Sequence, residues 1–212
     1  MTKIKGHHRL EAVEVSQVDE KLNPIPGTEK EYACDTLILS VGLIPENELS
    51  LMAGVELDPR TKGAVVDEFC QTTVPGVFAA GNVLHVHDLV DFVSLEAEKM
   101  AKGVVQYLSA GNPSDDTDEK TVSGLANAEI SIETGGFVGY TVPQKITGET
   151  DVVLSFRPRK PMRDAYVDVY QGENLVASKK YVKLLPAEME KITISAEKLV
   201  PGVCIKVVTR DE

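Results

Sequence analysis

The stretch TTVPGVFAAGN, residues 72–82, decides the fold of the first half of the chain. It contains a Pro-Gly turn signal and then a short apolar run, which predicts a buried strand ending at Gly81. Apolar residues recur at intervals of three and four over residues 89–108, which predicts an amphipathic helix with Asp88 as its N-cap. This order is typical of an open α/β sheet, where ligands bind at the carboxyl ends of the strands. The same pattern also suits a tight strand-to-helix turn that binds nothing.

A second buried strand is predicted upstream, at residues 36–41, which read TLILSV and are followed by Gly42. A continuous apolar run of this kind is typical of a parallel strand that is covered on both faces. Residues 9–18 and 30–34 alternate more loosely around the turn NPIPG at residues 23–27, so we expect a β-hairpin there.

Past the middle of the chain, the helical patterns stop and short strand patterns follow one another. The polar, acidic sequence between the two halves predicts a linker at residues 113–123 and a separate domain over residues 124–212. Several short strands without helices predict a small antiparallel β-sandwich-like domain. The six expected strands are residues 129–133, 152–156, 166–170, 175–182, 191–194 and 204–208.

The composition excludes several classes of function. The chain carries 22 basic and 33 acidic side chains, a formal net charge of −11. Such a surface repels phosphate groups, so we expect neither nucleic-acid binding nor docking on anionic lipid. No apolar run reaches the ~18 residues of a membrane helix, and no signal-peptide pattern is present, which together predict a cytoplasmic protein. Cys34, Cys70 and Cys204 form no CxxC pair, so we expect packed, reduced thiols without zinc.

Residues 72–82 resemble the second flavin-binding motif of the two-dinucleotide-domain flavoprotein oxidoreductases. This superfamily includes thioredoxin reductase and the pyridine nucleotide-disulfide oxidoreductases, and its motif reads T-x-x-P-x-[VIL]-[FY]-A-x-G-D. In the family the final Asp binds the ribityl chain of FAD. Asn82 stands at that position here, and it can still donate and accept hydrogen bonds although it carries no charge.

The resemblance implies which residues of this segment meet the cofactor. Gly81, Asn82 and Val83 would lie against the flavin. The helix that follows is similar to the one whose N-terminus faces the O2 edge of the flavin ring, so Leu89 and Val90 would supply backbone N–H groups there. The resemblance names no catalytic residue, and we expect no metal.

Residues 34–47, which read CDTLILSVGLIPEN, carry a second resemblance to the same family. They are similar to the segment that leaves the nicotinamide domain and re-enters the flavin domain, D-x-[VIL]-[VIL]-x-x-x-G-x-x-P-N. Asp35, Gly42 and Pro45 fit this pattern, and the usual asparagine comes one position late, at Asn47. Gly42 and Pro45 are therefore further cofactor-binding candidates.

The resemblance implies an α/β plus β chain. Residues 1–112 would be an incomplete doubly wound FAD/NAD(P)-binding domain, with the last hairpin of the nicotinamide domain at 1–34 and the end of the FAD domain at 35–112. No G-x-G-x-x-G loop occurs in the chain. We therefore expect a part of a longer enzyme that is inactive in isolation and uses FAD, with NAD(P) in the complete protein.

The implied function is transfer of hydride or electrons between NAD(P)H, FAD and an acceptor or partner subunit. The segments LIPENEL and AGNVLHVHDLVDFVS are similar to oxidoreductases found beside glycerol-3-phosphate dehydrogenase-type and amine- or opine-oxidising flavoproteins. A homo- or hetero-oligomer with a flavoprotein dehydrogenase-type partner is therefore expected. The alternative is a non-catalytic assembly module that docks a partner flavoprotein through its β domain. A basic cluster suits that role, formed by Arg157, Arg159, Lys160 and Arg163.

Two further segments allow more than one interpretation. His85 and His87 form an H-x-H pair, which suits a metal site or a proton donor beside the flavin, but exposed loop histidines are the simplest interpretation. Residues 135–144 place glycines beside aromatic side chains. This pattern suits a lid or an interdomain contact, and it suits a bulged strand equally well.

Overall fold

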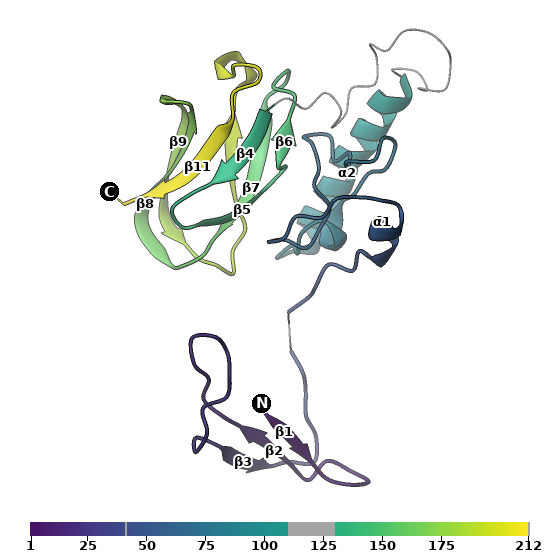
Figure 1. Ribbon diagram of the computed structural model, residues 1–212, viewed down its shortest axis with the longest axis vertical. Helices are drawn as coiled ribbons and strands as arrows, with labels where there is room; N and C mark the ends of the chain where they lie inside the picture. The colour runs from purple at the N-terminus through teal and green to yellow at the C-terminus, as the bar shows by residue number, and fades with distance from the viewer. Residues whose placement is uncertain (41, 110–129, 212) are drawn as a thin grey trace. The chain divides into compact units, whose positions relative to one another are not determined.

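The computed structural model describes residues 1–40, 42–109 and 130–211 (Figure 1). The chain divides into two compact units, residues 1–42 and 43–212, and each is described by itself. The predicted linker at 113–123 lies outside the described residues. No helix in the described ranges is long and apolar enough to cross a membrane.

The first unit is a three-stranded antiparallel sheet. Its strands are β1 (Lys3–Lys5), β2 (Ala12–Val15) and β3 (Lys30–Ala33), in the order β1-β2-β3. The pairing of β2 with β3 confirms the predicted hairpin. Ala12 and Val13 are the only buried hydrophobic residues among those described in this unit, so the sheet has a very small core.

The two buried parallel strands predicted from the sequence are absent from the described residues. Residues 36–40 belong to no strand, and the side chains of Ile38 and Leu39 are 87% and 62% exposed. Within residues 77–80, only Phe78 is paired, through a single bridge to Gln71. A parallel strand exists only through hydrogen bonds to its neighbours, and all strand pairs and bridges in the described part of residues 1–109 are antiparallel. An apolar run alone therefore did not predict a sheet.

Residues 43–109 fold around two α-helices and one 3₁₀ turn. These elements are α1 (Glu48–Met52), η1 (Gly81–Val83) and α2 (Val90–Ser109). The position of α2 confirms the predicted helix to within one residue. Gly103 lets α2 pack closely on the loop beneath it, because a Cβ atom there would lie 2.3 Å from the carbonyl oxygen of Phe69. The small core of this segment consists of Val55, Ala64, Val66, Ala79 and Leu84, and Val142 joins it from the sheets.

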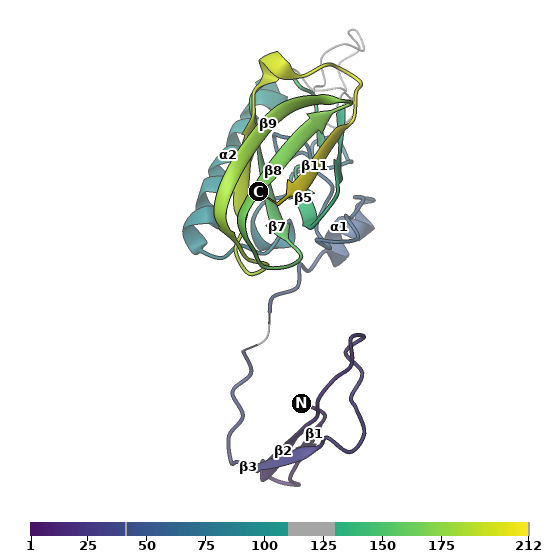
Figure 2. The same ribbon diagram turned by 90° about the vertical axis from the view of Figure 1, so that its left-hand side faces the viewer.

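Residues 130–210 form two sheets around one apolar core (Figure 2). The strand order is β10-β7-β5 in one sheet and β6-β4-β11-β8-β9 in the other. The strands are β4 (Ile130–Thr134), β5 (Val138–Val142), β6 (Lys145–Ile146), β7 (Val152–Pro158), β8 (Met162–Gln171), β9 (Asn174–Leu184), β10 (Glu190–Ile194) and β11 (Ile205–Arg210); the 3₁₀ turn η3 is Ala196–Lys198. Buried and less buried residues alternate along β7, as in a strand with one core-facing side.

All six strands predicted in this half are present, with shifted ends, and β5 and β6 are additional. The strand pairs of this half are antiparallel as predicted, except that β11 pairs with β4 in parallel. Residues 135–144 contain β5, which carries a register shift between Val138 and Tyr140. The mixed α/β fold thus has much sheet and few helices.

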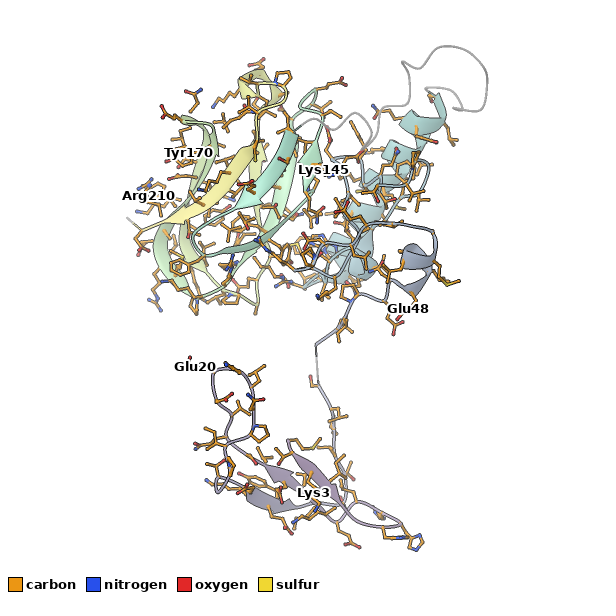
Figure 3. The ribbon with its side chains drawn as sticks, viewed as in Figure 1. Lys3, Glu20, Glu48, Lys145, Tyr170 and Arg210 are labelled. Atoms are coloured by element: carbon orange, nitrogen blue, oxygen red, sulfur yellow. The ribbon has the colours of Figure 1, made fainter. Side chains whose placement is uncertain are left out.

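The two parts of the second unit are hydrogen-bonded to each other. The side chain and backbone of Gln144 bond to both backbone groups of Val66, at 3.0 and 3.2 Å. The carboxylate of Glu68 accepts the backbone N–H of Thr147 at 3.0 Å. Figure 3 labels Lys145, which lies between Gln144 and Thr147 in the sequence. The segment 135–144 is therefore both a bulged strand and a contact with residues 43–109.

Candidate functional site at the turn before helix α2

The turn η1 requires a glycine at its first position. Gly81 is buried and has a φ of +73°, a backbone conformation that residues with a Cβ adopt rarely. An added Cβ would also lie 3.2 Å from Cγ1 of Val93 in α2. The backbone N–H of Gly81 donates to Oε2 of Glu96 at 2.6 Å. The turn is thus fixed against the first turns of α2.

Asn82, the residue at the ribityl-binding position of the motif, is exposed at the surface of this turn. Its Oδ1 accepts the backbone N–H of His87 at 3.1 Å, which closes the loop between them. The side chain therefore makes the local contact that asparagine often makes in turns. Binding of FAD by Asn82 remains a prediction, as it does for Val83, which is also exposed.

Asn47 joins the two sequence motifs directly. Its buried side chain donates from Nδ2 to the carbonyl oxygen of Val83 at 2.7 Å and to that of Lys62 at 3.0 Å. Its Oδ1 accepts the hydroxyl of Ser50 at 2.9 Å, within α1. Sequence reasoning gave Asn47 no role, although the motif expects an asparagine one position earlier. That displaced asparagine was the signal that pointed to it.

Replacing Asn47 with Ala should lower the free energy of unfolding by about 2 kcal/mol, because a buried side chain would lose its hydrogen bonds and two part-buried carbonyl oxygens would lose their donor. Asn47→Asp should be at least as harmful, since a carboxylate placed there faces two oxygens and donates to neither. Urea denaturation at neutral pH measures both. Ser50→Ala is the control, because it removes only the hydroxyl that contacts Asn47. Equal stability of the Ala variant and the wild type would show that the contact is not structural.

The other predicted site residues differ in where they lie and in how exposed they are. Leu89 and Val90, at the start of α2, are 57% and 76% exposed, and the first turn of a helix has backbone N–H groups without helical acceptors. Pro45 lines a cavity of about 310 Å³ together with His85 and other residues of the second unit. Gly42 belongs to the first unit, so its part in the site remains a prediction.

Asp88 does not cap α2 in the predicted way. Its carboxylate pairs with Arg157 of β7 and accepts the backbone N–H of Met189 at 2.8 Å. The side chain thus ties the start of α2 to the sheets. Arg157 also donates to the carbonyl oxygen of Val86 at 3.0 Å and to the hydroxyl of Tyr140 at 3.1 Å.

His85 and His87 are buried, which corrects the expectation of exposed loop histidines. Their side chains are 1% and 4% exposed. His85 Nε2 lies 2.7 Å from Oε1 of Glu96, and His87 Nε2 lies 2.9 Å from Oε2. One carboxylate of α2 therefore binds both imidazoles. Sequence reasoning missed Glu96, because only the packing of α2 on this loop brings it to the histidines.

In the cluster formed by His85, His87 and Glu96, burial and hydrogen bonding together decide the protonation of His85 and Glu96. Burial lowers the pKa of His85 and so favours the neutral imidazole. Burial alone would raise the pKa of Glu96, but the hydrogen bonds from His85 and His87 outweigh it and lower this pKa to about 2. At neutral pH the cluster therefore contains an ionised carboxylate, to which the imidazoles donate through Nε2.

These three side chains could also hold a metal ion, since their ligand atoms lie within 4.8 Å of one another. A metal bound at both Nε2 atoms would move the imidazole protons to Nδ1. The Nδ1 atoms of His85 and His87 are buried and have no hydrogen-bond partner in the structure. Histidines that bind metals nearly always donate their other N–H to an acceptor. The geometry thus favours a hydrogen-bonded cluster over a metal centre.

A cavity of about 210 Å³ adjoins this cluster, lined among others by Asp67, Cys70, His87 and Glu96. Asp67 is 1% exposed; its Oδ1 accepts the N–H groups of Phe69 and Gln71, while its Oδ2 has no partner. Burial raises the pKa of Asp67 to about 6 and that of the Cys70 thiol to about 11. Cys70 is therefore an unreactive thiol at neutral pH.

Replacing Asp67 with Asn should stabilise the chain above pH 6. The pKa of Asp67 is raised from 3.8 to about 6 in the folded chain, so folding binds a proton between these pH values and stability falls as pH rises through them. This pKa shift destabilises the folded chain by at most about 3 kcal/mol at high pH. The amide N–H of the new asparagine would be left without an acceptor, which offsets part of the gain. We therefore expect the free energy of unfolding to rise by about 1–2 kcal/mol at pH 7.5. Urea denaturation at pH 4.5 and 7.5 should show this gain only at pH 7.5. The control variant Glu98→Gln, on the exposed face of α2, should not show this gain at pH 7.5. A gain that is equal at both pH values would contradict it.

Comparisons with known proteins bear on this site. The family described as pyridine nucleotide-disulphide oxidoreductase matches residues 1–104. The small chain of glutamate synthase [NADPH] from Mycobacterium tuberculosis is 32% identical over 101 residues, which are 47% of this chain and 20% of that protein. Mitochondrial dihydrolipoyl dehydrogenase from Caenorhabditis elegans is 32% identical over 121 residues, 55% of this chain and 24% of that protein. The chain thus spans only a fifth to a quarter of the length of these relatives.

Proposed function

Because residues 1–104 of this chain belong to the pyridine nucleotide-disulphide oxidoreductase family, we propose that it is part of an FAD-dependent NAD(P)H oxidoreductase. In this proposal residues 43–109 complete the flavin site. Residues 130–211 form a small β-sandwich-like domain that supports this site and contacts a partner subunit. The electron acceptor is either a small molecule or that subunit.

The observation that carries the proposal is the hydrogen bond between Asn47 and Val83. It joins two residues that lie 36 positions apart, the last residue of the motif at 34–47 and the residue that follows the motif at 72–82. A chance resemblance of two separate stretches would not require them to meet in space. Their contact supports a single site at the turn before α2.

The residues at this turn fit the group they would bind. Gly81 has no Cβ, and the side chains of Asn82 and Val83 are exposed beside it. The exposed first turn of α2 offers backbone N–H groups to an electron-rich edge, which is how helix N-termini bind anionic groups. Bound FAD would supply the redox chemistry, while the chain binds and orients it.

The exposed apolar surface of this segment supports a larger domain around the site. Four apolar side chains close to Asn47 in the sequence are each more than 60% exposed: Leu43, Ile44, Leu49 and Met52. Asn47 itself is hydrogen-bonded to the turn η1 through Val83. Large apolar side chains gathered in this way mark a surface that another part of a protein covers. The remainder of a flavin domain is the cover that we propose.

The colour of the protein tests the proposal. The gene product that carries this chain, tagged and purified from its own host with its associated subunits, should absorb near ~450 nm and lose this colour when NADH or NADPH is added without oxygen. The 212-residue chain alone should not retain FAD at micromolar concentration, because it contains no G-x-G-x-x-G loop to hold the pyrophosphate. A colourless native preparation would overturn the proposal and favour an assembly module.

A further inference from the structure

Glu96 accepts hydrogen bonds from three groups of one loop. These groups are the backbone N–H of Gly81 at 2.6 Å, Nε2 of His85 at 2.7 Å and Nε2 of His87 at 2.9 Å. The loop, residues 81–87, contains both the turn η1 and the exposed side chain of Asn82. A single buried carboxylate thus holds the loop at its beginning, its middle and its end.

These bonds also decide which face of the loop is available to a ligand. The N–H of Gly81 and both imidazoles point inward, toward Glu96 on α2. Asn82 and Val83 remain exposed, as do Leu89 and Val90 at the start of α2, and the turn η1 contacts this helix. The carboxylate therefore fixes the turn and the helix N-terminus relative to each other.

We propose that Glu96 is the positioning residue of the cofactor site, holding the Gly81–His87 loop in the shape that binds flavin. This inference rests on the proposed function. It assigns to Glu96 a role through the loop and not through contact with the cofactor. Neither the carboxylate nor the imidazoles take part in a chemical step.

The isosteric variant Glu96→Gln changes how many hydrogen bonds the side chain can accept but keeps the size of the side chain. All three groups of the loop are donors, and glutamine offers one acceptor oxygen and one donor nitrogen in place of two oxygens. To satisfy that nitrogen, one imidazole must accept at Nε2 and carry its proton on Nδ1. Both Nδ1 atoms are buried without a partner, so this tautomer leaves a buried donor unpaired. The loop should therefore shift in Glu96→Gln even though the side chain still fits.

The first experiment measures the imidazole tautomers of the 212-residue chain by ¹⁵N NMR. Both His85 and His87 should be protonated at Nε2 in the wild type, and one of them should change to Nδ1 in Glu96→Gln. This readout needs no cofactor. Nε2 tautomers of both histidines in Glu96→Gln would overturn the positioning role whatever the protein binds.

The second experiment measures the dissociation constant for FAD in the complete flavoprotein, below its melting temperature. Glu96→Gln should bind FAD at least ten times more weakly, and Glu98→Gln, on the same helix but exposed, should bind as the wild type does. A merely structural role would lower the melting temperature and leave the affinity unchanged, which would overturn the inference. If the wild type itself bound no FAD, the proposed function would fail, and the tautomer measurement would still judge the role of Glu96.

A second pair of variants covers the case in which Glu96→Gln does not fold. His87→Gln keeps an N–H donor near the position of Nε2, whereas His87→Leu removes it. FAD affinity close to that of the wild type in His87→Gln, with a clear loss in His87→Leu, is the expected result. Equal affinities in the two variants would contradict the inference.

Discussion

Replacing Arg157 with Met is expected to lower the free energy of unfolding by about 2–3 kcal/mol, a large effect for a partly exposed residue. The guanidinium pairs with Asp88 and donates to the carbonyl oxygen of Val86 and to the hydroxyl of Tyr140. Methionine fills most of the same space but leaves these groups without their donor. Removing one partner of a buried pair costs about 3–5 kcal/mol, and the 27% exposure of the Asp88 side chain reduces that figure.

Thermal and urea denaturation of the 212-residue chain measure this loss. Arg157→Lys should fall between the wild type and Arg157→Met, because lysine keeps the charge but lacks the planar fork that reaches several acceptors. Arg159→Met, two residues further along and exposed, is the matched control and should change stability by less than about 0.5 kcal/mol. If Arg157→Met were no less stable than Arg159→Met, the contacts of Arg157 would not hold these parts together.

The inward position of Arg157 also changes the interpretation of the basic cluster. Arg157 is used inside the chain, and the ammonium group of Lys160 lies 3.4 Å from the ring centroid of Phe137. Arg159 and Arg163 are exposed, and the backbone of Arg163 in β8 lies opposite that of Lys183 in β9. The cluster is thus not a single patch of free cations, and docking of a partner through it remains a prediction without added support.

FAD binding should weaken about 5- to 150-fold when Asn82 is replaced with Ala in the complete flavoprotein. If the Asn82 amide bonds a flavin hydroxyl in a desolvated site, removing it leaves that hydroxyl unpaired, at a cost of about 1–3 kcal/mol. Each 1.4 kcal/mol is a tenfold change in affinity. Asn82→Asp should be tolerated, because the family resemblance places an aspartate of nearly the same shape at this position.

The contact between Asn82 and His87 supplies the competing explanation. Asn82→Ala also removes the acceptor of the His87 N–H, which alone would lower the melting temperature with and without FAD. Measuring the FAD dissociation constant together with the melting temperature of the FAD-free protein, for wild type, Ala and Asp variants, separates the two roles. An Ala variant with reduced stability but unchanged FAD affinity would show that Asn82 only closes the loop.

The elements that the sequence predicted correctly are those that depend on local residue patterns. The helix α2 follows from apolar spacing along one segment, and the strands of the second half follow from alternation between turn signals. The runs at 36–41 and 77–80 were misinterpreted because a buried strand requires neighbours, and composition does not show whether they are present. Asn47 was within reach of the sequence, since the motif expects an asparagine beside that position. Glu96 was not, because its partners lie 9 and 11 residues away and meet it only after α2 has packed.

The two bonds of Asp88 have a consequence for how the second unit opens. One carboxylate oxygen pairs with Arg157 in β7, and the other accepts the N–H of Met189, just before β10. The amide of Met189 exchanges with solvent deuterium only when this bond breaks, and breaking it frees the start of α2 from that turn. Local opening in proteins proceeds in cooperative units. Met189 lies in a segment that carries none of the cofactor motifs. Deuterium uptake at its amide therefore records the release of a helix end that is 101 residues away in the sequence.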